Sequence, residues 1–145
     1  MTIFTYGSLM FPEVWEKVTG LTVAGVPAVL ADHAARRIRG QSYPVLQAEA
    51  GARVRGVLYV GVPPDAVARL DEFEGAFYDR VPVAVRLEQG GATASAWVYR
   101  AARPEDPDIL PEAWVAEHFA RESLARFLQE ELPAETHREE PKPAA

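Results

Sequence analysis

Residues 70–80 read LDEFEGAFYDR, and this stretch decides how the chain is interpreted. It ends a predicted helix that places Val67, Leu70 and Glu74 on one face at the i, i+3, i+7 spacing. Gly75 follows at once and predicts the helix stop, because glycine adopts the left-handed conformation without a steric penalty. A glutamate is therefore expected at the carboxyl end of a helix, on the edge of its apolar face.

Glu74 is the candidate general acid/base. The helix dipole disfavours negative charge in the last turn, and apolar neighbours withdraw a carboxylate from water. Both effects raise the pKa of a carboxyl group toward the range that is useful for proton transfer. The residues alone leave a second interpretation open, in which Glu74 only hydrogen-bonds a backbone group near Gly75. Asp71 and Glu72 are expected to point outward as solvated acids.

A glycine turn follows the first predicted strand. Residues 2–6 are mainly β-branched or aromatic, and the strand breaks at Gly7 and Ser8. Such a turn can align the backbone N–H groups of the loop from Tyr6 to Leu9 into a nest for a carboxylate or a developing oxyanion. The alternative is an ordinary turn without a ligand. A serine nucleophile at Ser8 is disfavoured, because the three histidines of the chain offer no local base.

The composition is that of one globular domain. The 145 residues are 48% hydrophobic and 25% charged, which is an ordinary mixture for a chain with a buried core. Cysteine is absent and the histidines lack metal-ligand spacing, so no metal site is predicted. A net charge of −6 argues against nucleic acid as a partner. Without a long apolar run or a signal-peptide pattern, we expect no membrane association and a cytoplasmic location.

The remaining elements are predicted from periodicity and turn residues. We expect strands over residues 2–6, 22–30, 33–39, 53–62, 81–87 and 93–101. We expect helices over residues 12–18, 63–74 and about 112–131. Pro27 predicts a bend or an edge position for its strand. Hairpin-linked strands with few helices favour an α+β domain on a mostly antiparallel, barrel-like sheet over residues 1–132. A polar tail at 133–145 follows and is predicted to be disordered.

Together these segments resemble the γ-glutamylcyclotransferase-like family, in its AIG2-like branch. The likeness rests on FTYGSL at residues 4–9, SYP at 42–44, RGVLYV at 55–60 and LDEFEGAFYDR at 70–80. The last of these strings is the most specific. The resemblance implies a mixed, mostly antiparallel β-barrel with flanking helices and a cavity between the loop and the glutamate.

The resemblance also implies an activity. Glu74 would be the general acid/base, and no cofactor or metal is implied. The substrate-binding residues that it implies are Tyr6, Gly7, Ser8, Leu9 and Tyr78. The free α-amine of a small γ-glutamyl compound would attack its own γ-carbonyl, giving 5-oxoproline and releasing the attached amine. Leu9 stands where the classical cyclotransferase loop has asparagine, which favours a γ-glutamyl amine or amide over a free γ-glutamyl amino acid.

A second function is compatible with the same residues, namely a non-catalytic protein that binds a small carboxylate or amino-acid-like ligand in the same cavity. Tyr43 and Tyr99 are possible cavity walls, and Arg80 belongs to the specific string without an assigned role. The sequence identifies neither the γ-glutamyl compound nor the oligomeric state.

Overall fold

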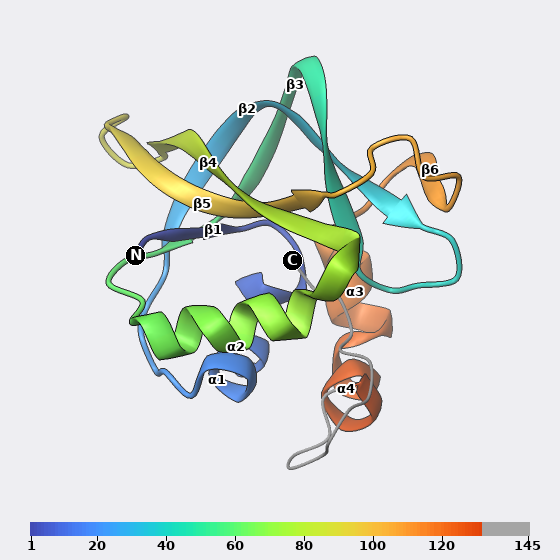
Figure 1. Ribbon diagram of the computed structural model, residues 1–145, viewed down its shortest axis with the longest axis horizontal. Helices are drawn as coiled ribbons and strands as arrows, with labels where there is room; N and C mark the ends of the chain where they lie inside the picture. Colours follow the sequence, from blue (N-terminus) through green and yellow to red (C-terminus); the bar gives the residue numbers. More distant parts are fainter. Residues whose placement is uncertain (132–145) are drawn as a thin grey trace.

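A closed, mixed β-barrel forms the centre of the computed structural model, which describes residues 1–131 (Figure 1). Around the barrel the neighbouring strands are β3 (Pro44–Tyr59), β1 (Ile3–Thr5), β5 (Thr93–Ala101), β4 (Tyr78–Leu87) and β2 (Val26–Ile38), and β2 pairs back with β3. Strands β1 and β5 run parallel, while the other pairs are antiparallel. The predicted fold class is therefore confirmed.

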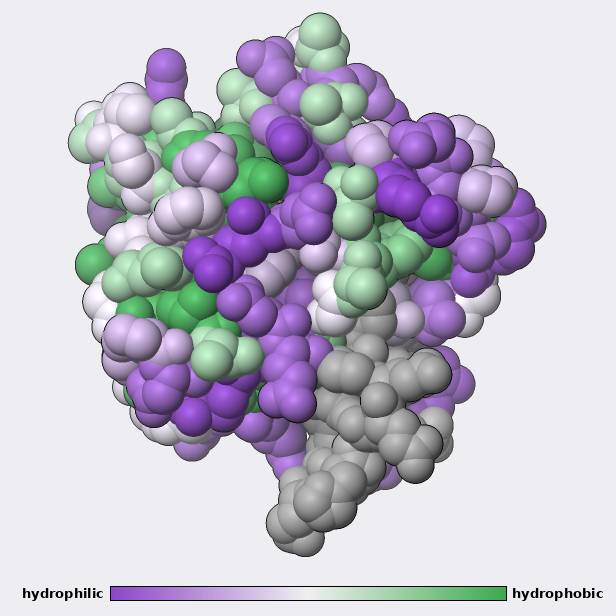
Figure 2. All heavy atoms as spheres, viewed as in Figure 1, coloured by the Kyte–Doolittle hydropathy of each residue, from purple (hydrophilic) through white to green (hydrophobic). Residues whose placement is uncertain are grey.

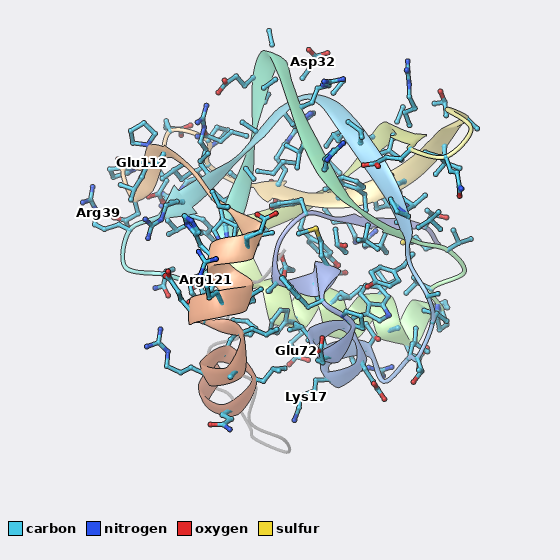
Figure 3. All side chains as sticks on the ribbon, turned by 180° about the vertical axis from the view of Figure 1, so that it is seen from behind. Lys17, Asp32, Arg39, Glu72, Glu112 and Arg121 are labelled. Atoms are coloured by element: carbon cyan, nitrogen blue, oxygen red, sulfur yellow. The ribbon has the colours of Figure 1, made fainter. Side chains whose placement is uncertain are left out.

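One long strand, β2, replaces two predicted strands. Residues 22–30 and 33–39 were expected as separate strands, but β2 continues from one segment into the other. Asp32 and Gly51 both have positive φ, 61° and 83°, and the Asp32 carboxylate accepts the Gly51 N–H at 3.0 Å. The β2–β3 ribbon folds over at this point, where Figure 3 labels Asp32. A bulge with aspartate in the left-handed region thus bends the strand without ending it.

Of the two outcomes predicted from Pro27, a bend or an edge position, the edge position is wrong. Strand β2 pairs with β3 on one side and with β4 on the other, and the Pro27 carbonyl accepts the N–H of Glu88 at 3.1 Å. Proline is tolerated because it is the second residue of the strand, before the first residue that pairs with β4. Strand β3 also starts earlier than the predicted residue 53, because the bent half of β2 gives residues 44–48 a partner.

Two helices, both of which were predicted, lie together beneath the barrel in Figure 1. Helix α1 (Pro12–Thr19) ends at Gly20 with φ 77°, and helix α2 (Pro64–Glu74) ends at Gly75 with φ 75°. Helix α2 is followed by a 3₁₀ turn, η2 (Gly75–Phe77), which leads into β4. The buried face of α2 consists of Ala66, Val67, Leu70, Phe73 and Glu74.

The predicted helix over residues 112–131 is partly wrong. Its start belongs to a short strand, β6 (Ile109–Ala113), which pairs with the second half of β2. The helical part is broken at Ser123 into α3 (Ala116–Glu122), α4 (Leu124–Arg126) and a π-helical turn, η3 (Phe127–Glu131). Pairing with the bent half of β2 overrides helix propensity here. The predicted tail, residues 133–145, lies outside the described residues.

Hydrophobic residues on the drawn face of the molecule form separate green groups between purple ones in Figure 2. Among the residues that the structure describes, the exposed large hydrophobic side chains are Met1, Val23, Val60 and Val115. Within residues 1–131, no helix is both long and apolar enough to cross a membrane.

Candidate active site

The loop that follows β1 is buried. Gly7 connects β1 to a 3₁₀ turn, η1 (Ser8–Met10), which is closed by hydrogen bonds from the Met10 N–H to the Gly7 carbonyl and from the Phe11 N–H to the Ser8 carbonyl. Tyr6, Ser8 and Leu9 are each 2% exposed or less. The loop therefore turns back into the protein, with its backbone held by its own short turn.

Glu74 is also buried. It is the last residue of α2, on the same face as Leu70 and Phe73, and only 1% of the residue is exposed. The sequence spacing predicted this face, because one turn of helix separates Leu70 from Glu74. Gly75 ends the helix immediately afterwards, and its N–H donates to the Asp71 carbonyl. A carboxyl group in the core is uncommon, since burial removes the water that stabilises its charge.

The charge of Glu74 acts on tyrosine hydroxyls of the loop and of the barrel strands. Burial raises the pKa of the Tyr6 hydroxyl well above its ordinary value, and the negative charge of Glu74 raises it further. Burial also raises the pKa of Tyr78, with smaller contributions from Tyr6 and Glu74. The pKa of Tyr99 is raised by burial and by Asp71, and again by Glu74. One carboxyl group thus acts on tyrosines from three other segments of the fold.

The hydroxyl protons of these tyrosines are committed to protein acceptors. The Tyr6 hydroxyl donates to the Tyr99 carbonyl at 2.7 Å, and the Tyr78 hydroxyl donates to the Pro44 carbonyl at 2.5 Å. A hydroxyl that donates its single proton keeps two oxygen lone pairs as acceptors, and at Tyr6 the Leu46 backbone already uses one of them. The surroundings of Glu74 are therefore rich in oxygen acceptors, which suits a ligand that carries an ammonium group.

Asp71 is exposed, as expected of a solvated acid, but two neighbouring side chains also bind it. Its carboxylate accepts two hydrogen bonds from Arg80, at 2.9 and 3.2 Å, and one from the Tyr99 hydroxyl at 2.6 Å. Burial alone would raise the pKa of Asp71, but the hydrogen bonds from Arg80 and Tyr99 outweigh it and hold the pKa below its usual value. The only sequence signal for this pairing was Arg80 in the specific string. Glu72, labelled in Figure 3, is exposed as expected.

A cavity of about 360 Å³ opens beside the loop. Tyr6 and Met10 line it from the loop, Trp114 lines it from the segment after β6, and Arg36 and Glu49 line it from the ribbon. Glu74 is not among the described residues that line it. Arg36 and Glu49 form an ion pair, and the Trp114 indole donates to the Ser42 carbonyl at 2.7 Å. The cavity therefore borders Tyr6, the first residue of the loop.

The structure brings Tyr6, Glu74 and Tyr78 into one buried region, and the roles predicted for them and for Gly7, Ser8 and Leu9 stay predictions. Tyr43 and Tyr99 are buried as well, at 4% and 3% exposure. Among residues 1–131, no group of three or more acids and histidines is arranged to hold a metal ion. The chemistry available at this site is proton transfer by a buried carboxyl group beside a tight backbone turn.

Comparisons with known proteins agree on one family. Residues 3–116 match the family described as gamma-glutamyl cyclotransferase, AIG2-like. AIG2-like protein C of Arabidopsis thaliana is 31% identical over 126 residues, which are 87% of this chain and 73% of that protein. A solution structure of an Arabidopsis thaliana protein has a TM-score of 0.71 at 29% identity, covering 88% of this chain and 85% of that one.

A structure named gamma-glutamyl cyclotransferase shares the fold at greater distance. Its TM-score is 0.62 at 21% identity, and the match covers 70% of this chain and 66% of that one. The match of the family over most of the chain agrees with the resemblance seen in the loop at residues 6–9 and in the string at 70–80. The chain belongs to the AIG2-like gamma-glutamyl cyclotransferase family.

Proposed function

We propose that this protein cyclises a small γ-glutamyl amine or amide to 5-oxoproline and releases the attached amine, with Glu74 as the general acid/base. The observation that carries the proposal is the burial of Glu74 at the end of α2, close enough to the Tyr6 loop for its charge to act on the Tyr6 hydroxyl. The family membership supports the class of reaction.

In the proposed reaction the carboxylate of Glu74 accepts a proton from the α-ammonium of the substrate. The freed α-amine attacks the γ-carbonyl carbon of the same molecule, so a ring C–N bond forms. The original amide C–N bond then breaks, and the proton passes from Glu74 to the departing nitrogen. Burial disfavours the charged form of a carboxyl group, which makes such an acid better matched to proton transfer near neutral pH.

The loop has a separate role in the proposal. Attack on the γ-carbonyl places negative charge on its oxygen, and backbone N–H groups of the turn at residues 6–9 would stabilise that charge. The acceptor oxygens of Tyr6 and Tyr78 would receive hydrogen bonds from the α-ammonium before it loses its proton. Because the attack is intramolecular, holding the substrate in a curled conformation supplies much of the rate enhancement.

The test is a panel of γ-glutamyl compounds incubated with the purified protein, with 5-oxoproline followed by mass spectrometry. The panel includes γ-glutamyl amines, γ-glutamyl amino acids and γ-glutamyl-lysine. We expect turnover of at least one compound and a loss of about 100-fold or more in Glu74→Gln. Glu72→Gln is the matched control, because it is the same substitution on the same helix at an exposed position.

The alternative of a non-catalytic binding protein predicts another pattern. A panel compound would then raise the melting temperature without release of 5-oxoproline. Turnover that is equal in Glu74→Gln and the wild type would remove Glu74 from the mechanism. Turnover that falls equally in Glu72→Gln would show that the assay reports the charge of the helix and not the buried carboxyl group.

A further inference from the structure

We propose that Asp71, Arg80 and Tyr99 form a clamp that positions Glu74 relative to the Tyr6 loop. The inference rests on the proposed function, in which Glu74 transfers the proton. These three residues lie on α2, β4 and β5, and they are named the clamp below. They are positioning residues, because Glu74 is the residue that would contact the reacting atoms.

The first part of the clamp is a bidentate ion pair. Arg80 donates from Nε and Nη2 to the two carboxylate oxygens of Asp71, and its guanidinium lies over the Trp97 ring at 5.0 Å from the centroid. Exposed ion pairs contribute little in general, but a bidentate pair within a larger network is the exception. The Arg80 fork therefore fixes the orientation of the Asp71 side chain as well as its distance from the barrel.

The second part of the clamp is Tyr99, which holds both sides of the candidate site. Its hydroxyl donates to Asp71 at 2.6 Å, and its backbone carbonyl accepts the Tyr6 hydroxyl at 2.7 Å. Tyr99 lies opposite Arg80 in the β4–β5 register, so both donors reach the same carboxylate. A single residue of the barrel thus sets the spacing between helix α2 and the first residue of the loop.

The clamp acts where a helix is least rigid. Glu74 is the last residue of α2, and terminal turns fray unless other contacts hold them. Asp71 begins this turn, its carbonyl accepts the Gly75 N–H, and its side chain is bound to the barrel. The last turn of α2, which contains Glu74, is therefore held through both the backbone and the side chain of Asp71.

Two variants and one matched control test the clamp. Arg80→Lys keeps the positive charge but loses the fork, and Tyr99→Phe removes only the hydroxyl, leaving the carbonyl that binds Tyr6. Arg69→Lys is the control: Arg69 tethers α2 to α1 through the Thr19 carbonyl at 2.7 Å and pairs within α2 with Asp65 at 3.6 Å, and neither partner belongs to the clamp or the loop.

Activity and titration are measured on each variant. We expect kcat to fall about 10-fold or more in Arg80→Lys and Tyr99→Phe, with KM changed less than about threefold, because misplacement mainly affects the chemical step. We also expect the carbon-13 resonance of the Glu74 carboxyl group, assigned by its loss in Glu74→Gln, to shift its titration midpoint by about half a pH unit or more. Arg69→Lys leaves both quantities at the wild-type values.

Any of three results overturns the clamp. The first is a wild-type Glu74 titration in both clamp variants, and the second is equal changes in Arg69→Lys. A fall in melting temperature alone, with kcat and the titration unchanged, also overturns it, because that is the effect of a purely structural contact. If no panel compound is turned over, the proposed function fails, and the titration still decides whether the clamp positions Glu74.

Discussion

Replacing Gly56 with alanine tests how closely the barrel must hold the loop. Gly56 lies in β3, where it crosses β1 just before the loop begins. A Cβ atom at this position would lie 2.1 Å from the Thr5 carbonyl oxygen, and 2.6 and 2.9 Å from atoms of the Phe4 ring. Backbone cannot rotate away as a side chain can, so β1 and β3 must move apart.

The magnitude follows from these distances. An ordinary contact begins at 3.4 Å, so the Cβ needs about 1.3 Å more room than the strands leave. Overpacking of a close-packed interior costs about 1–3 kcal/mol, and a backbone obstacle places this site at the upper end, about 3 kcal/mol. For a chain of this length that corresponds to a fall of about 10 °C in melting temperature. A shift of about 1 Å in the loop would also lower kcat/KM by about 100-fold.

The assay combines thermal and urea unfolding with the 5-oxoproline measurement. Gly25→Ala is the control, since its Cβ would meet Val57 Cγ1 at 2.0 Å, which is the end of a side chain that can change rotamer. We expect Gly25→Ala to cost less than about 1.5 kcal/mol.

The expected backbone clash is refuted if the free energy of unfolding of Gly56→Ala lies within about 0.5 kcal/mol of the wild-type value. It is also refuted if Gly25→Ala is the more damaging of the two, because a movable side chain would then be the harder obstacle. If Gly56→Ala is less stable but still active, the contact between β1 and β3 affects stability without controlling the placement of the loop.

Two further predictions concern the tyrosines and the last helices. Burial raises the pKa of four of the five tyrosines above 10.0, to about 12 for Tyr59. Since the folded state holds these protons more tightly than the unfolded chain, stability is retained below pH 10 and lost as the pH rises toward 12. The phenolate absorbance should therefore rise together with unfolding. A rise in absorbance from four phenols near pH 10, separate from unfolding, would contradict this. Phe119→Ala should cost about 3–5 kcal/mol in urea unfolding, because the centroid of this ring lies 5.4 to 5.8 Å from those of the Phe11, Trp114 and Phe127 rings. Val115→Ala, at an exposed position, should change stability by less than about 0.5 kcal/mol.

Local patterns in the sequence were enough for the elements whose stability is local. The apolar period and the terminal glycine predicted α2 and placed Glu74 on its buried face, and the alternation before Gly90 predicted the β4–β5 hairpin. Such patterns report which face of an element meets the core, and that property is written in consecutive residues.

Elements that depend on distant partners were predicted less well. The break predicted between residues 30 and 33 is a bend within β2, because β3 follows it through the bulge at Asp32. Residues 109–113 form a strand instead of joining a helix, because the bent half of β2 offers an edge for pairing. Neither outcome can be read from a window of neighbouring residues, since the deciding hydrogen bonds join segments far apart in the chain.

The sequence by itself determined the family, the barrel fold and the choice of Glu74, because a specific string of residues and a helical period carry that information. Only the tertiary structure decided that Asp71 is bound to Arg80 and Tyr99, and that Tyr99 also holds Tyr6. The physical reason is register: Tyr99 follows Asp71 by 28 positions, and the pairing of β4 with β5 brings its hydroxyl to that carboxylate.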